Sequence, residues 1–157
     1  MTDTPSPPFS AAQRRALAVV LDDIIPPRAD GRLPGAGAIG VAAYIEEALR
    51  PMPALQAMVA QGLDALDQLA RQRGAASVAE LPPAEQTALV NQLAGSEQAL
   101  PPIVMLHTFA GYYQQPRVLE ALGLPTRPPH PVGYEMEPLD LTLLEPVRRR
   151  GGLYRDC

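Results

Sequence analysis

The sequence contains one cysteine, no lysine and no tryptophan. Because the single cysteine, Cys157, has no partner in the chain, an intrachain disulfide and a cysteine-rich zinc site are excluded. All 13 basic residues are arginines, and the formal net charge of −4 disfavours binding to nucleic acid or to an anionic membrane surface. No run approaches the roughly 18 apolar residues of a membrane-spanning helix, so direct membrane insertion is not expected.

The remaining composition is that of a folded chain with one domain. The 157 residues are 46% hydrophobic and 19% charged, which is typical of a globular protein and not of a disordered one. Proline is unusually frequent, with 19 residues. A chain of this length buries roughly 68–70% of its unfolded surface, and it therefore needs neither a disulfide nor a metal ion to fold.

Arg14 and Arg15 resemble the start of a twin-arginine export signal. The apolar stretch that follows, residues 16–21, is shorter than the roughly 7–15 residues of such a signal, and no small-residue cleavage site comes after it. We therefore interpret the pair as exposed residues near the start of a helix. The expected compartment is the cytoplasm, with the periplasm as the alternative if an exported partner carries the chain.

Apolar residues at helical spacing predict an all-α fold, a small bundle of about five helices. Ser10 and Gln13 fit a capping box, which satisfies free N–H groups at the start of a helix. Proline suits the first position of a helix, because the N–H that it lacks would have no partner there. The predicted helices cover about residues 10–25, 38–50, 53–74, 83–94 and 102–113, with a short additional helix at 117–122.

The pattern changes toward the C-terminus. From Pro116 to Pro146 prolines are frequent and no helical or strand period persists, although apolar residues such as Leu139 and Leu143 are interspersed. This segment is too apolar for a solvated linker, so we predict an extended chain that lies across a surface, either its own or a partner's. The predicted organisation is a flexible arm at 1–9, a helical domain at 10–123 and an extended, Pro-rich, partner-wrapping arm at 124–157.

The glycines at 35, 37 and 40 have the G-x-G-x-x-G spacing of a dinucleotide-binding loop. Such a loop connects a strand to a helix, and an acidic residue follows about 20 positions later. Here a proline-rich segment precedes the glycines, and residues 52–56 contain no acidic residue. We therefore interpret the segment as a flexible loop that enters a helix, and we expect no cofactor in this chain.

The two histidines are His107 and His130. His107 is expected on the apolar side of a helix with Val104, Leu106 and Ala110, where a core or interface position is favoured over catalysis. His130 lies in a rigid polyproline-like segment. Neither has a Cys, Asp or Glu at metal-ligand spacing, and the chain has no Gly-x-Ser-x-Gly motif of a hydrolase.

Two pairs of charged residues on the predicted helices have structural explanations. Asp22 and Asp23 are adjacent, and adjacent positions on a helix do not face one another, so capping and solubility explain them better than acid–base catalysis. Glu46 and Arg50 are spaced for an ion pair on the helix surface.

Tyrosine and arginine gather in the last third of the chain. Both residue types often anchor protein interfaces, whereas the triplet at 148–150 is too small for a nucleic-acid footprint on an acidic domain. A solvated tail is the alternative for this triplet, and core packing is the alternative for Tyr112. The predicted partner-interface residues are Tyr112, Tyr113, Arg117, Tyr134, Arg148, Arg149, Arg150, Tyr154 and Arg155.

A series of short motifs spans most of the chain. They occupy residues 21–26 (LDDIIP), 34–37 (PGAG), 41–45 (VAAYI), 62–67 (GLDALD), 81–86 (LPPAEQ), 111–117 (GYYQQPR) and 132–134 (VGY). In this order they resemble the gluconate 2-dehydrogenase subunit 3 family over roughly residues 10–155. The order along the chain is more specific than any single motif.

The resemblance implies a small helical subunit without flavin or catalytic residues. It implies a partner, a large FAD-containing dehydrogenase subunit of the glucose-methanol-choline type, whose folding, stability or export the small subunit supports. Such complexes oxidise sugars or related polyols. The Pro-rich end, residues 141–155, is closer to members paired with glycoside 3-oxidising dehydrogenases.

The first hypothesis is therefore a non-catalytic subunit of a FAD-dependent oxidoreductase, in a heterodimer with a large flavoprotein. One alternative is a small stand-alone enzyme that uses His107 or His130 with a nearby carboxylate. The other is a self-associating helical protein whose arm swaps between copies.

Overall fold

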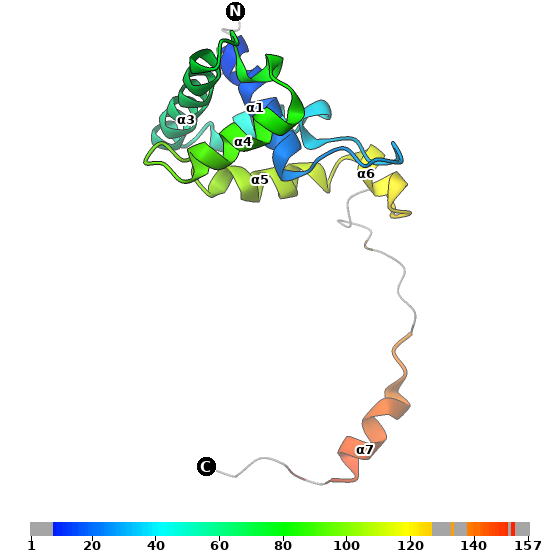
Figure 1. Cartoon of the computed structure of the whole chain (residues 1–157). Helices are drawn as coiled ribbons and strands as arrows, with labels where there is room; N and C mark the ends of the chain where they lie inside the picture. The colour runs from blue at the N-terminus through cyan, green and yellow to red at the C-terminus, as the bar shows by residue number, and fades with distance from the viewer. Residues whose placement is uncertain (1–7, 127–132, 134–137, 151, 153–157) are drawn as a thin grey trace, which may run out of the picture. The chain divides into compact units, whose positions relative to one another are not determined.

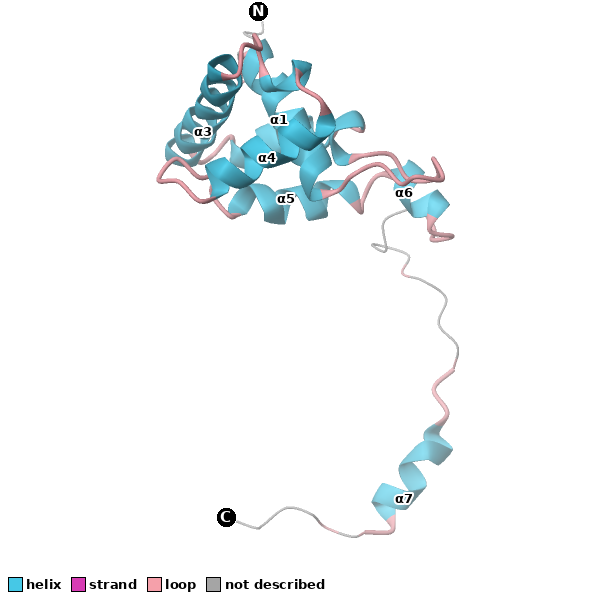
Figure 2. Ribbon diagram, viewed as in Figure 1, coloured by secondary structure: helices cyan, strands magenta, loops and turns pink. Residues whose placement is uncertain are grey.

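The computed structural model describes residues 8–126, 133, 138–150 and 152 (Figure 1). The chain divides into two units, Met1–Thr126 and Arg127–Cys157. Within the described residues the chain forms seven α-helices and no strand, which confirms the all-α prediction (Figure 2). No helix among these residues is both long enough and apolar enough to cross a membrane.

The helices of the first unit begin and end close to their predicted positions. Ser10 and Gln13 form the capping box at the start of the first helix, as predicted. Two 3-10 turns, η1 (Ala36–Ala38) and η2 (Val78–Glu80), lie between helices. The helices are α1 (Ala11–Ile24), α2 (Val41–Leu49), α3 (Pro53–Gln72), α4 (Pro83–Ala94), α5 (Ile103–Tyr112) and α6 (Pro116–Ala121).

Helix α1 organises the core of the first unit, because it contacts α2, α3, α4 and α5. Its buried residues include Leu17 and Leu21, which pack with Ile45 of α2 and Leu63 of α3 in one apolar cluster. Phe9 belongs to the same cluster and is 1% exposed. The prediction that residue 9 belongs to a flexible arm is therefore wrong, because burial of this aromatic ring extends the folded domain beyond the start of α1.

The proline- and glycine-rich segment between α1 and α2 is held against α1. The Asp22 carboxylate accepts a hydrogen bond of 2.8 Å from the backbone N–H of Gly37. A Cβ at Gly37 would collide with the backbone carbonyl of Ala18, and a Cβ at Gly35 would collide with the Asp22 side chain. The interpretation of this segment as flexible is therefore wrong, since its glycines serve close packing against α1.

An ion pair joins α1 to α2. The Arg14 guanidinium donates to both oxygens of Glu46, with Nε–Oε1 and Nη2–Oε2 distances of 2.6 and 3.0 Å. The hydrogen bond with Glu46 raises the pKa of Arg14 above its ordinary value. The expected pair between Glu46 and Arg50 does not form, because Arg50 pairs with Glu47 at 2.6 Å.

The second unit contains a short helical segment where an extended chain was predicted. Residues 141–144 form the 3-10 turn η3 (Leu141–Leu144), and α7 (Glu145–Arg148) follows directly. Asp140 begins the segment, since its Oδ1 accepts hydrogen bonds from Oγ1 and N of Thr142 at 2.7 and 3.0 Å. These two bonds lower the pKa of Asp140. The extended prediction is therefore wrong for these residues, because a local side-chain cap outweighs the high proline content around it.

Candidate functional site

Tyr112, one of the predicted interface residues, lies in the core of the first unit. Its side chain is 1% exposed, and its hydroxyl donates a hydrogen bond of 2.8 Å to the backbone carbonyl of Pro34. Burial raises the pKa of this hydroxyl, with the neighbouring Tyr113 as a smaller cause. The structure thus gives Tyr112 the core position that the sequence left open, and its ring is covered by its own domain.

Tyr113 and Arg117 lie on the surface of the same unit. The Tyr113 ring lies parallel to that of Phe109, with 6.4 Å between the ring centroids and 5° between the ring planes. It also meets the Tyr112 ring edge-on at 5.2 Å. Arg117 is exposed at the start of α6. Both predicted residues are therefore accessible to a partner.

The second unit presents basic and apolar side chains to solvent. Arg148, Arg149 and Arg150 are exposed, and Arg149 pairs with Glu145 at 3.1 Å along the helix. Tyr134, Tyr154, Arg155 and His130 lie outside the described residues. Among the described residues of this unit, the exposed large apolar side chains are Leu139, Leu141, Leu143, Leu144 and Val147.

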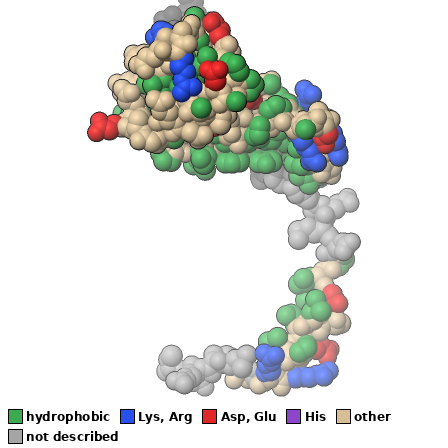
Figure 3. Space-filling view, viewed as in Figure 1, with side chains coloured by type: hydrophobic (Ala, Val, Ile, Leu, Met, Phe, Trp, Pro, Cys, Tyr) green, Lys and Arg blue, Asp and Glu red, His purple; other side chains and the backbone are tan. Residues whose placement is uncertain are grey.

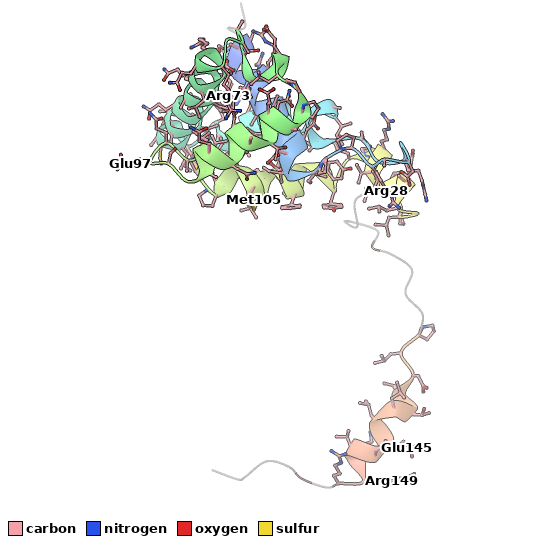
Figure 4. The ribbon with its side chains drawn as sticks, viewed as in Figure 1. Arg28, Arg73, Glu97, Met105, Glu145 and Arg149 are labelled. Atoms are coloured by element: carbon pink, nitrogen blue, oxygen red, sulfur yellow. The ribbon has the colours of Figure 1, made fainter. Side chains whose placement is uncertain are left out.

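A further apolar surface, which was not predicted, lies on the outer side of α5. Met105, Leu106, Phe109 and Tyr113 are 55%, 61%, 43% and 49% exposed, and we call these four residues the α5 face. Hydrophobic side chains form a band along the lower edge of the helical unit in Figure 3, where α5 runs in Figure 1. Met105 points away from the helical body in Figure 4.

The inner side of α5 packs closely against the core of the first unit. Its buried residues are Val104, Thr108, Gly111 and Tyr112. The Thr108 hydroxyl is satisfied by the carbonyl of Val104 at 2.7 Å. A Cβ at Gly111 would lie 2.7 Å from Cδ1 of Tyr44, so the absence of a side chain at Gly111 permits α2 and α5 to pack closely.

The structure separates residues that were expected together on the apolar side of this helix. Val104 is buried and His107 is half-buried, whereas Leu106 and Ala110 are exposed. Gly111 is a point of close contact between α5 and α2. Residues 98–116 contain no Asp, Glu, Lys or Arg, and this absence of charge is the sequence feature that coincides with the exposed apolar face.

An open apolar hollow of about 260 Å³ adjoins the α5 face. It lies between α1, α4 and α5, and its lining includes Val90, Leu93, Leu100 and Met105. Met105 therefore belongs both to the hollow and to the α5 face. The lining also includes Asp23, whose Oδ1 accepts a hydrogen bond of 2.7 Å from the Thr87 hydroxyl.

His107 is half-buried on α5, beside the ring of Tyr44. The two rings meet edge-on, with 5.9 Å between their centroids. Among the described residues the buried Nδ1 of His107 has no hydrogen-bond partner. The described part of the chain brings together no group of three His, Cys, Asp or Glu side chains that could hold a metal ion.

Comparison with protein families identifies the family of the chain. The family Gluconate 2-dehydrogenase subunit 3 matches residues 11–127. The chain belongs to this family. Within the gluconate 2-dehydrogenase subunit 3 family, the match covers α1 to α6 and ends beside the division between the two units. The motif at 132–134 lies beyond it. No curated protein and no solved structure matches the chain.

Three polar residues of the motifs described above serve the fold of the chain. Asp67 is buried in α3, and its Oδ1 accepts a hydrogen bond of 2.9 Å from the backbone N–H of Val78 at the start of η2. The Gln86 side chain donates to the carbonyl of Leu81 at 2.9 Å, which secures the start of α4. Together with the hydrogen bond of Tyr112, these contacts give three polar residues of the motifs a structural role within the first unit.

Proposed function

We propose that this chain is a non-catalytic accessory subunit that binds and stabilises a large FAD-dependent dehydrogenase subunit of the glucose-methanol-choline type. The family is that of a small subunit of a gluconate dehydrogenase complex, so membership supports a role within a multi-subunit dehydrogenase. FAD then resides in the partner, and this chain holds no cofactor. The substrate class is a sugar, with a glycoside oxidised at its 3-position as the more specific proposal.

The observation that carries this proposal is the exposed apolar surface of this chain, which belongs to a family of dehydrogenase subunits. Large apolar side chains are exposed on α5 and again between residues 139 and 147. Contiguous apolar patches on a folded protein mark sites of protein interaction, because leaving them in water is unfavourable. This surface is what we expect of a subunit whose exposed apolar residues are covered by a partner in the complex.

The second unit supplies the polar part of the proposed contact. Arg148, Arg149 and Arg150 suit paired hydrogen bonds with carboxylates of the large subunit. Tyr134, Tyr154 and Arg155 remain proposed contacts of the same segment. The complex is proposed to act in the cytoplasm, with the periplasm as the alternative for an exported partner.

Co-purification tests this function directly. The tagged full chain is expressed with and without the large flavoprotein of its host, and each eluate is examined by gel and by visible absorbance. We expect the large chain and its flavin to elute together with the tagged chain, and the tagged chain alone to be colourless. Flavin absorbance or dehydrogenase turnover in the chain purified alone would contradict the proposal.

A further inference from the structure

Helix α5 is apolar on the side that faces solvent as well as on the side that faces the core. Its inner residues pack against α1 and α2, and the α5 face carries four large side chains into water. A helix that is hydrophobic all round is normally buried on all sides. In the first unit by itself, α5 therefore lacks a covering layer.

The electrostatic character of this surface restricts what can cover it. No residue between 98 and 116 carries a formal charge, whereas Glu97 and Arg117 flank the stretch. Burying an unpaired charge against such a surface is costly, so the covering surface must itself be uncharged and apolar. A central apolar region bordered by charged residues is the usual anatomy of a specific interface.

The shape of the surface restricts the occupant further. The α5 face continues at Met105 into the hollow beside α4, whose volume is about 260 Å³. Such a hollow accommodates a projecting apolar side chain, and anchors of this kind carry most of the binding energy in many interfaces. Two copies of this chain would each bring a net charge of −4, which disfavours self-association.

We infer that the α5 face and the adjoining hollow are the docking site for the large dehydrogenase subunit, which covers them with an uncharged apolar segment. One apolar side chain of that segment enters the hollow beside Met105. The inference rests on the proposed function, and it adds the surface through which the partner is held. It places a major contact on the folded domain, separate from the contact proposed for residues 127–157.

The test compares two sets of exposed apolar residues in the full-length chain. The variant Leu106→Gln/Phe109→Gln changes the α5 face, and Met58→Gln is the matched control because Met58 is 52% exposed on α3. Affinity for the purified large flavoprotein is measured by titration. We expect the double variant to weaken binding at least about tenfold and the control to stay within about twofold. Circular dichroism melting is expected to be unchanged in both variants, since the substituted side chains are exposed.

Each outcome has a distinct meaning. If the unaltered chain binds the flavoprotein and the double variant binds equally well, the α5 face is not the docking site, while the proposed function stands. If the unaltered chain does not bind the flavoprotein, the proposed function fails and the inference fails with it. If light scattering shows a dimer of this chain that only the double variant loses, a second copy covers the face and the inference is overturned.

A second control addresses coverage by the chain itself. Binding of an apolar fluorescent dye is compared between the full chain and a chain without residues 127–157. We expect dye binding to stay equal or to fall, because the deletion also removes exposed apolar residues such as Leu139 and Leu143 and uncovers none on the α5 face. A large increase in dye binding on deletion would show that the C-terminal segment covers the face, and it would overturn the inference.

Discussion

The hydroxyl of Tyr112 donates a hydrogen bond of 2.8 Å to the backbone carbonyl of Pro34, and so joins the end of α5 to the segment between α1 and α2. The same segment is held from the other side by the hydrogen bond between Asp22 and Gly37. Two long-range contacts thus fix a segment whose sequence, rich in proline and glycine, indicates a loop without preferred structure.

Replacing Tyr112 with phenylalanine is expected to destabilise the chain by about 1 kcal/mol, because the Pro34 carbonyl loses its donor while the ring still fills the core. Urea denaturation followed by circular dichroism measures the change. The matched control is Tyr113→Phe, at a ring that is 49% exposed, for which a change below about 0.5 kcal/mol is expected. Equal effects of the two substitutions would show that the Tyr112 hydroxyl has no special role.

The stability of the unaltered chain is expected to fall at alkaline pH relative to that of Tyr112→Phe. Burial raises the pKa of Tyr112 above its ordinary value of 10.0, so the unfolded chain releases this proton at a lower pH than the folded chain. The stability that the protonated phenol contributes is therefore complete below about pH 10 and declines as the pH rises further. The stability difference between the unaltered chain and Tyr112→Phe should therefore be constant below about pH 10 and narrow as the pH rises above it. A stability difference that stays constant at alkaline pH would contradict the raised pKa of Tyr112.

Replacing Gly37 with alanine is expected to destabilise the fold by about 1–3 kcal/mol, because the added methyl group meets the carbonyl of Ala18 in a closely packed region. The control is Gly95→Ala, since the nearest atom to a Cβ at Gly95 lies 3.8 Å away. Thermal unfolding of both variants provides the measurement. Flavin and nicotinamide binding should be absent before and after the change. Equal melting temperatures for Gly37→Ala and Gly95→Ala would rule out the steric explanation.

The buried carboxylate of Asp67 is expected to matter more than the exposed carboxylate of Asp64. Asp67→Ala leaves the Val78 N–H without its 2.9 Å acceptor, at a cost of about 1–3 kcal/mol. Asp64 accepts from the Gln13 side chain on the surface, so Asp64→Ala should change stability by less than about 0.5 kcal/mol. Chemical denaturation of both variants distinguishes the two positions, and the reverse order of effects would contradict the structural role of Asp67.

The helices could be predicted from the sequence because their signals are local. The capping box at Ser10 and the prolines that begin α3 and α4 act within one turn, and the structure places these helices within a few residues of the prediction. The turn begun by Asp140 is equally local. Asp140 is a capping residue that indicates a turn, but the many prolines around it favoured the extended prediction.

The candidate site could not be predicted in the same way, because it depends on contacts between distant residues. Gly111 packs closely against Tyr44, and this contact between α5 and α2 cannot be inferred from spacing within α5. Tyrosine and arginine content predicted Tyr113 and Arg117, which are exposed, as interface residues, but the same prediction included the buried Tyr112. Absence of charge over residues 98–116 was the better indicator of an unpartnered surface.

Deletion of residues 127–157 is expected to leave the first unit folded while weakening its hold on the large subunit. The division of the chain falls at Thr126, and all core residues in the described part of the chain lie in the first unit. The truncated chain should therefore keep the melting temperature of the full chain, and its circular dichroism should still show the helices α1–α6. Loss of the apolar and arginine-rich segment should lower affinity for the flavoprotein at least about tenfold, and combining the deletion with Leu106→Gln/Phe109→Gln should lower it further. A deletion that unfolds the first unit would show that the C-terminal segment packs on its own domain, and undiminished affinity would show that the helical unit alone carries the interface.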